Sequence, residues 1–249
     1  MIVCKSDEEL RTMRQAALIV ADVLQVVRNM VGIGVRTRDL DIVAEEIILK
    51  ASGKPAFKGY NGFPATLCTS INSQIVHGIP GDYKLRAGDI ISLDCGVCLD
   101  GFYADSAVTV PVGEISERLK ILLRVTEEAL HKGIEQARVG NRVSDISAAV
   151  QKHVEPNGFS VVREFVGHGI GRSLHEEPQI PNYGPPGRGP KLEEGMVLAI
   201  EPMVNTGSPA HRTLADGWTA VTTDGGYSAH FEHSVAITVN GPWILSQKN

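Results

Sequence analysis

Two stretches of the chain match each other, and each ends on a carboxylate. L-R-A-G-D-I-I-S-L-D closes on Asp94, and L-E-E-G-M-V-L-A-I-E closes on Glu201. The match continues downstream, where Y-A-D-S-A-V-T-V carries Asp105 and F-E-H-S-V-A-I-T-V carries Glu232. Carboxylates are seldom buried without a partner, so four of them on apolar strands call for a compensating cation. The repeat therefore predicts a metal enzyme built from two fused halves.

The first pair of carboxylates lies on a predicted hairpin. Asp100-Gly101 separates two β-like runs and suits a two-residue type I′ turn. That turn sets a register in which Asp94 lies opposite Ala107, with Asp105 as its diagonal neighbour on the same face, roughly 7 Å away. One or two cations fit between side chains at that spacing. The alternative is that both acids simply face solvent, and the repeat argues against it.

Two histidines lie between the carboxylate pairs, in G-H-G-I-G-R-S-L-H-E-E-P. A lone histidine is more often structural, but His168 and His175 stand in a glycine-rich segment where backbone and imidazole can approach a ligand closely. The string is neither the H-E-x-x-H zinc signature nor G-x-G-x-x-G. The segment therefore indicates a functional site outside those two families.

The chain also carries a C-x-x-C string, formed by Cys95 and Cys98. Residues three apart on a strand point to opposite faces, and no second cysteine pair follows, so a zinc knuckle or redox pair is disfavoured. Four unevenly spaced cysteines are also too few for a disulfide framework. We expect packed, reduced thiols.

Helical periodicity falls into two groups that would support these strands. Ser6 followed by Glu9 is a capping box that starts a helix ending before residue 32. Thr37 is expected to cap a second helix through residue 48. Ser116 and Ser144 precede two more helical stretches, which separate the first carboxylate pair from the second half of the chain.

The remaining segments read as loops and strands. A loop is expected at 59–64, followed by T-L-C-T-S-I and a turn segment around His77, after which strands are expected. A surface loop is expected at 181–190, which is dense in Pro and Gly. Beyond it the chain is mostly β. Residues 218–223 and 227–239 flank Asp224-Gly225-Gly226, which predicts that these two runs form a hairpin.

Composition narrows the class of protein further. The chain has 249 residues, 43% of them apolar, which is enough for one large domain or two fused halves. A formal net charge of −5 disfavours binding to DNA or to an anionic membrane. Residues 1–30 read as an amphipathic helix rather than a signal peptide, and no apolar run approaches a membrane span. A cytoplasmic protein is expected.

Several motifs recurring in order give the chain a resemblance to the type I methionine aminopeptidases of the M24 metallopeptidases. They are N-S-Q-I-V-H-G-I-P, D-C-G-V-C-L-D-G-F-Y-A-D, G-H-G-I-G-R-S-L-H-E-E-P, A-I-E-P-M and F-E-H-S. The resemblance runs nearly end to end. It implies the pita-bread fold, an α/β (α+β) architecture of two pseudo-symmetric halves with antiparallel sheet covered by helices. It also implies one catalytic domain over 1–249, with a pseudo-repeat of approximately 1–112 and 113–249.

The resemblance further implies a cofactor of two divalent metal ions. Its metal ligands correspond here to Asp94, Asp105, His168, Glu201 and Glu232, all of which are present. In the family Asp105 and Glu232 bridge the two metals, Asp94 chelates one, and His168 with Glu201 completes the other. An oxygen-rich set with one imidazole suits Mn, Fe(II), Co or Zn and is unlike a thiolate zinc site. Such metals lower the pKa of bound water and polarise a peptide carbonyl.

Catalytic and substrate-binding roles also follow from the resemblance. It implies that Glu201 handles protons, that His175 hydrogen-bonds the substrate carbonyl, and that His77 contacts the scissile amide. The side chains implied to line the methionine pocket are Tyr60, Phe63, Cys68, Leu174 and Trp218. Leu174 departs from the family, in which this position is typically aromatic. Without the resemblance, each of the five would be read as a core residue.

The implied activity is removal of the initiator methionine from nascent proteins with a small second residue, by a monomer acting near the ribosome. The alternatives are a pita-bread aminopeptidase of other specificity and a non-catalytic pita-bread module that binds RNA or protein. Intact metal ligands and the acidic charge disfavour the module. The short segment between His168 and Glu201 disfavours the type II enzymes, and the short segment ahead of Asp94 disfavours prolidase-like relatives.

Overall fold

The structure is a computed structural model that describes residues 2–248 of the chain. Its α-helices are α1 (Asp7–Met30), α2 (Thr37–Lys50), α3 (Glu117–Gln136) and α4 (Val143–Val154), and its 3₁₀ helices are η1 (Tyr60–Gly62) and η2 (Glu155–Asn157). Ser6 caps α1 through the predicted capping box, and Ser116 accepts a hydrogen bond from Leu119 at the start of α3. Both helix starts are therefore confirmed.

The start of α2 differs from the prediction. Thr37 is the first residue of the helix, and the cap position belongs to Arg36, whose side chain makes no capping hydrogen bond. The Thr37 hydroxyl instead accepts a hydrogen bond from the amide of Gly81 and contacts the Gly81 carbonyl. The Thr37 hydroxyl, which the local pattern assigned to the helix end, therefore binds the loop at Gly81, which is distant in sequence.

The described strands form one nine-stranded sheet and two three-stranded sheets. The large sheet contains β1 (Lys54–Pro55), β2 (Leu67–Ile71), β4 (Ile90–Leu99), β5 (Phe102–Pro111), β7 (Gly167–Gly169), β8 (Glu176–Ile180), β9 (Val197–Ile200), β14 (Glu232–Thr238) and β15 (Gly241–Ile244). The small sheets are β6 (Ser160–Val161), β10 (Met203–Asn205) and β13 (Ser228–His230), and β3 (Gln74–Val76), β11 (His211–Thr213) and β12 (Ala220–Thr222). All of the pairings are antiparallel.

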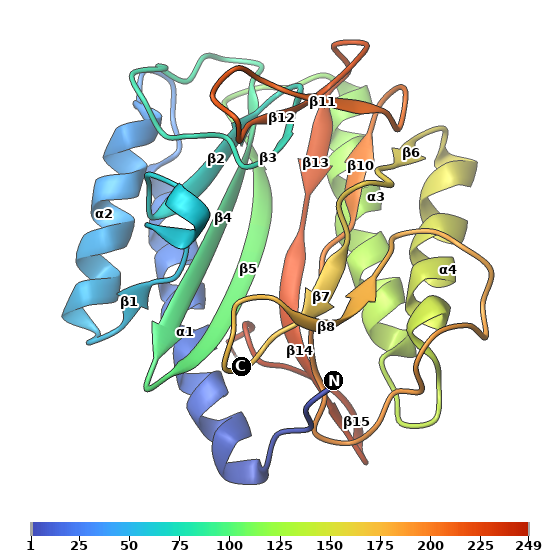
Figure 1. The fold of residues 1–249 in the computed structure, drawn as a ribbon. Helices are drawn as coiled ribbons and strands as arrows, with labels where there is room; N and C mark the ends of the chain where they lie inside the picture. Colours follow the sequence, from blue (N-terminus) through green and yellow to red (C-terminus); the bar gives the residue numbers. More distant parts are fainter. Residues whose placement is uncertain (1, 249) are drawn as a thin grey trace.

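Helices cover the sheet in two groups, as Figure 1 shows. The blue helices α1 and α2 lie against the strands of the first half, and the green-yellow helices α3 and α4 lie against those of the second. Each group has its own apolar core: one packs α1 and α2 on β4 and β5, and the other packs α3 and α4 on β9 and β14. This is the predicted pita-bread fold, and the division near residue 112 stays a prediction.

The predicted hairpin of the first half is confirmed to the residue. Strands β4 and β5 pair Leu99 with Phe102 and Asp94 with Ala107. Asp100 and Gly101 both have positive φ angles, of 50° and 80°, as a type I′ turn requires. The turn therefore determines where both carboxylates of this hairpin lie.

The hairpin predicted around residues 224–226 is wrong. The strand before the turn, β12, pairs with β11 and β3, and the strand after it, β13, pairs with β10. The Asp224 carboxylate instead binds the loop at Ser208, whose amide donates to it, and it also accepts a hydrogen bond from the amide of Gly226. Turn-forming residues between two strand-like runs therefore do not specify which strands pair.

The sequence repeat has a physical counterpart in the backbone. Gly88 and Gly195 occupy equivalent places in the two matching stretches and have φ angles of +92° and +86°. This left-handed conformation suits glycine, and each residue turns the chain into a strand that leads to a carboxylate. Within residues 2–248, no helix combines the length and apolar character needed to cross a membrane.

Candidate active site

One row of residues crosses the middle of the large sheet. In register, Cys68 of β2 faces Asp94 of β4, Asp94 faces Ala107 of β5, and Ala107 faces Glu232 of β14. The next pair, His233 with Ile200, places Glu201 directly beyond the end of β9 and beside Glu232. Opposite residues on neighbouring strands have side chains on the same face, about 5 Å apart at their origins. The fold therefore gathers carboxylates from both halves of the sequence.

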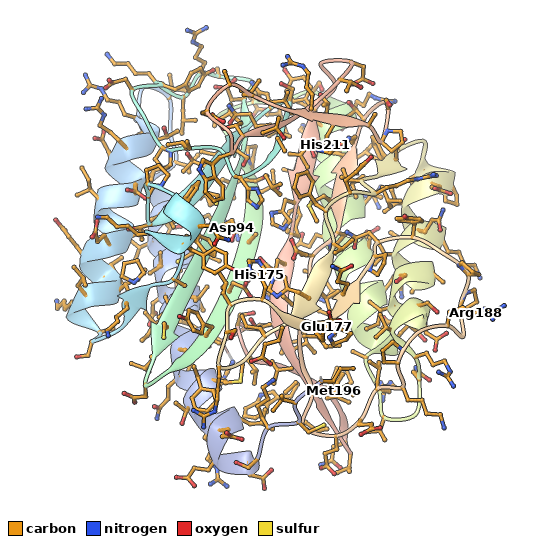
Figure 2. All side chains as sticks on the ribbon, viewed as in Figure 1. Asp94, His175, Glu177, Arg188, Met196 and His211 are labelled. Atoms are coloured by element: carbon orange, nitrogen blue, oxygen red, sulfur yellow. The ribbon has the colours of Figure 1, made fainter. Side chains whose placement is uncertain are left out.

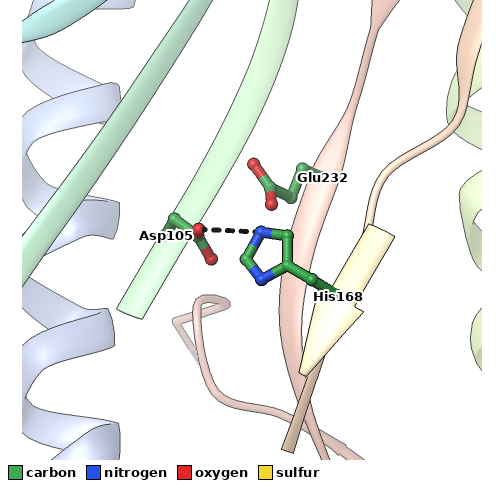
Figure 3. Close-up of side chains that lie close together, drawn as sticks. All are labelled: Asp105, His168 and Glu232. Atoms are coloured by element: carbon green, nitrogen blue, oxygen red, sulfur yellow. Dashed lines mark ion pairs between the residues drawn. The ribbon is translucent and has the colours of Figure 1, made fainter. Parts of the chain in front are cut away.

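The centre of this row is a compact cluster formed by Asp105, His168 and Glu232, shown in Figure 3. One ligand atom from each of the three lies within 4.8 Å of the others, and the three residues are 3%, 7% and 3% exposed. Asp105 lies two residues before Ala107, on the same face of β5. The cluster thus takes one carboxylate from each half and its imidazole from β7.

The orientation of His168 is set by its own backbone neighbour. Its Nδ1 lies 2.9 Å from the carbonyl oxygen of Gly169. A carbonyl only accepts, so Nδ1 carries the proton, and in the neutral ring the lone pair is on Nε2. Nε2 faces Asp105 at 3.6 Å and Glu201 at 3.5 Å. Metal-binding histidines are commonly fixed in this way by a second hydrogen bond.

Burial makes these carboxylates electrostatically unfavourable in the absence of a cation. Withdrawal from water raises the pKa of Asp94, Asp105, Glu201 and Glu232, and repulsion from neighbouring carboxylates adds to the shift for Asp94, Asp105 and Glu232. Nearby imidazoles oppose these upward pKa shifts, His230 for Asp94 and Asp105 and His168 for Glu201. The Ser234 hydroxyl, which donates to Asp105, opposes the shift as well. Such a site gains most from a bound cation.

Two further histidines border the cluster. The ring of His175 lies 4.3 Å from that of His168, and its Nδ1 is 2.8 Å from the hydroxyl of Tyr60. His77 lies between aromatic rings, 5.5 Å from Phe165 and 6.3 Å from Trp218. Withdrawal from water lowers the pKa of both His77 and His175 to about 4, so each is neutral at pH 7.

The cluster forms the floor of a cavity of about 310 Å³. All of the site residues predicted from the sequence line this cavity. Figure 2 shows two of them, Asp94 and His175, near the middle of the molecule between the two helix groups. One wall is apolar: Phe63 and Cys68 form a buried cluster with Ala65, and the Trp218 ring meets Phe63 edge-on at 5.2 Å.

The cavity also contains residues that the sequence analysis missed. These are Phe57, Asn61, Val76, Phe165, Val166, Met203 and His230. His230 is 2% exposed, and its Nε2 lies 3.3 Å from Glu201 without a hydrogen-bonding geometry. A signal for it existed, because His230 precedes Glu232 by two residues and strand side chains alternate between faces.

The donor set fits a divalent metal. Asp94 Oδ1 and His230 Nε2 are buried and have no hydrogen-bond partner among the described residues. Four carboxylates with one imidazole are hard, oxygen-rich ligands, which divalent ions such as Mn and Fe(II) accept readily. A buried site of this kind, beside an apolar pocket in a pita-bread fold, defines a metal-dependent hydrolase.

Comparisons with known proteins narrow this class. The sequence profile of metallopeptidase family M24 matches residues 11–239. The chain is 57% identical to a methionine aminopeptidase of Clostridium perfringens and 55% identical to methionine aminopeptidase 1 of Bacillus subtilis, covering 99% of the chain and at least 99% of each relative. The crystal structure of methionine aminopeptidase from Thermotoga maritima superposes with a TM-score of 0.98 at 48% identity, covering all of both chains. The chain therefore belongs to metallopeptidase family M24 and, within it, to the methionine aminopeptidases.

Proposed function

We propose that this chain releases the N-terminal methionine from nascent polypeptides whose second residue is small. Two divalent ions would be held by Asp94, Asp105, His168, Glu201 and Glu232. The observation that carries the proposal is the buried carboxylate and imidazole cluster on the floor of a cavity that has an apolar wall. Similarity to the methionine aminopeptidases named above supports an N-terminal methionine as the residue removed.

Bound metal would supply a Lewis acid and lower the pKa of water at this site. The remaining chemistry belongs to the side chains. Tyr60 can donate its hydroxyl proton to His175 Nδ1, which leaves the Nε2–H of the neutral ring free to donate to the substrate carbonyl oxygen as negative charge develops. A pKa near 4 keeps His175 in this neutral form at pH 7.

Two other groups act on the scissile bond in this proposal. Glu201 takes up a proton during attack and returns it to the leaving amine, and its raised pKa suits a group that must exchange protons near neutral pH. His77 contacts the scissile amide, and the rings of Phe165 and Trp218 hold it in place.

The methionine side chain of the substrate would lie in the cavity against its apolar wall. Phe63, Cys68 and Leu174 are all at least 95% buried around it, and Tyr60 and Trp218 complete the pocket. An unbranched thioether fits among these rings because methionine adapts its shape and interacts favourably with aromatic faces. We place the activity in the cytoplasm, where nascent chains emerge, and propose that the protein works as a monomer.

The first test is release of free methionine from Met-Ala-Ser and Leu-Ala-Ser by chelator-treated protein, with Mn, Co, Fe(II) or Zn added back separately. We expect cleavage of the Met peptide alone, restored by metal. Cleavage of both peptides would point to an aminopeptidase of other specificity. No cleavage with any metal, by protein shown to be folded, would overturn the proposal and favour a non-catalytic binding module.

A further inference from the structure

The segment 171–175 carries two residues of the cavity, Leu174 and His175, yet it lies between strands β7 and β8 rather than within regular structure. The ring of His175 must be held accurately if it is to meet a developing charge. Tyr60 reaches it from one side, but the Tyr60 side chain is itself exposed. Another contact must therefore hold the backbone of this segment.

That contact comes from the residues that precede α1. Lys5 Nζ donates to Glu176 Oε2 at 2.6 Å and to the Val3 carbonyl at 2.9 Å. The side chain of Lys5 is 3% exposed and that of Glu176 is 14% exposed, so water screens this ion pair far less than a surface pair. Glu176 Oε1 in turn accepts from the amide of Ser173 and closes the segment on itself.

The residues around Lys5 leave space for its side chain. A Cβ on Gly171 would lie 2.3 Å from Cε of Lys5, so only glycine at this position leaves the side chain its path. The Lys5 amide donates to the Gly195 carbonyl at 2.7 Å, and the Gly171 carbonyl accepts from the Tyr103 amide at 2.7 Å. Lys5 is thus fixed at its backbone and at its ammonium group, with the His175 segment between it and the β4–β5 hairpin.

We propose that Lys5 is a positioning residue for His175, acting through its buried ion pair with Glu176. The inference rests on the proposed function, since it assigns Lys5 to the same reaction. Figure 2 labels His175 and Glu177, the residues on either side of Glu176 in the chain. Lys5 itself does not line the cavity.

The test compares Lys5→Met in two backgrounds, the wild-type chain and His175→Ala. If Lys5 works by placing His175, Lys5→Met lowers kcat for a Met-Ala-Ser peptide by about 10- to 100-fold in the wild-type chain, the scale of a 1 Å misplacement. The value of KM changes less, and metal content stays constant. In the His175→Ala background the same substitution lowers kcat less than about threefold, because the group it would place is gone.

A second variant guards against a folding defect. Glu176→Gln keeps the size of the side chain but removes its charge and one of its two acceptor oxygens, and we expect a smaller loss of kcat in the same direction. Lys132→Met is the matched control, because it breaks the exposed Lys132–Glu135 pair on α3 and should leave kcat unchanged. All rates are measured well below each variant's unfolding midpoint.

Two results would overturn the inference while leaving the proposed function intact. One is full activity in both Lys5→Met and Glu176→Gln. The other is an equal loss from Lys5→Met in both backgrounds, which would assign Lys5 to general stability. An inactive wild-type chain would instead refute the proposed function.

Discussion

The two halves of the molecule deliver their carboxylates by different routes. In the first half, Asp94 and Asp105 come from two ten-residue strands, β4 and β5, joined by a two-residue turn. In the second, Glu201 follows the four-residue strand β9, and the chain then runs through β10 to β13 before it reaches Glu232 on β14. The first half provides a continuous two-stranded platform, whereas the long excursion of the second half forms walls of the cavity, including Met203 and Trp218.

The comparison teaches that equivalent ligands need not have equivalent surroundings. A continuous hairpin with a local turn sets the register of the two acids in the first half, and Ser234 of β14 adds a hydrogen bond to Asp105 from the second half. The excursion of the second half positions Glu201 and Glu232 through partners distant in sequence, and it also brings cavity-lining side chains to the site. Substitutions of the proposed metal ligands in the two halves should therefore have similar effects on activity. Substitutions away from the metal should have different effects in the two halves.

The largest expected effect is on kcat, and it should be similar for a metal-site carboxylate from either half. We expect Asp105→Asn and Glu232→Gln each to lower kcat by more than about 10³-fold, because each removes a charge that would hold the metals and thereby the acidified water. Metal content after dialysis, measured with Met-Ala-Ser turnover, checks this. If one of the two variants kept its metal and more than a tenth of its activity, the two halves would not be equivalent at the metal.

A smaller loss should separate chemistry from metal binding. We expect His175→Ala to lower kcat by about 10²- to 10³-fold, the usual cost of removing one donor to a developing oxyanion. Metal content should not change, in contrast to Glu232→Gln. Single-turnover kinetics with metal analysis give both quantities, and loss of metal from His175→Ala would instead make this residue part of the metal site.

The excursion of the second half should affect substrate binding more than turnover. Trp218→Ala removes the edge-on contact with Phe63 and opens the apolar wall, so we expect KM for Met-Ala-Ser to rise about tenfold, a typical cost for one hydrophobic contact. Steady-state kinetics measure it. Val239→Ala, at a site 70% exposed and outside the cavity, is the control. A fall in kcat with constant KM would contradict the assignment of Trp218 to the pocket.

The smallest effect compares two turns. Gly101 and Gly225 have φ angles of 80° and 74°, and an added Cβ meets no atom at either, so alanine costs only backbone strain, about 1 kcal/mol of unfolding free energy. Denaturant unfolding should give similar losses for both. Only Gly101→Ala should weaken metal binding in a titration, because its turn sets the register of two ligands. Equal weakening by Gly225→Ala would remove the contrast between the halves.

The same contrast explains what the sequence could predict. The Asp100-Gly101 turn has a local rule for its register, so the positions of Asp94 and Asp105 followed from the sequence and agree with the structure. The turn at Asp224-Gly225 has similar residues, but its flanking strands pair with segments far away in sequence. Strand partners of that kind are chosen by tertiary packing, which local pattern does not contain.

Site residues follow the same division. The metal-site and pocket residues were predictable from the repeat and from the motifs behind the family resemblance, and the structure gathers them around one cavity, while their individual roles stay predictions. His230 and Lys5 were missed. His230 lies two residues before Glu232 in the run predicted as one strand, so alternation of side chains was an available signal, although the structure divides this run into β13 and β14. Lys5 meets Glu176 only through tertiary structure, so no spacing could reveal the pair.

The β5–β14 pairing, which joins Glu232 to Ala107 and His233 to Ser106, has a consequence for motion. Many two-lobed enzymes open and close about a hinge that lies beside the substrate. Here the line between the lobes is itself a hydrogen-bonded ladder, and the residues proposed as metal ligands stand on both sides of it. Separating the two halves would pull these residues apart, so a hinge opening along this line is incompatible with an intact metal site.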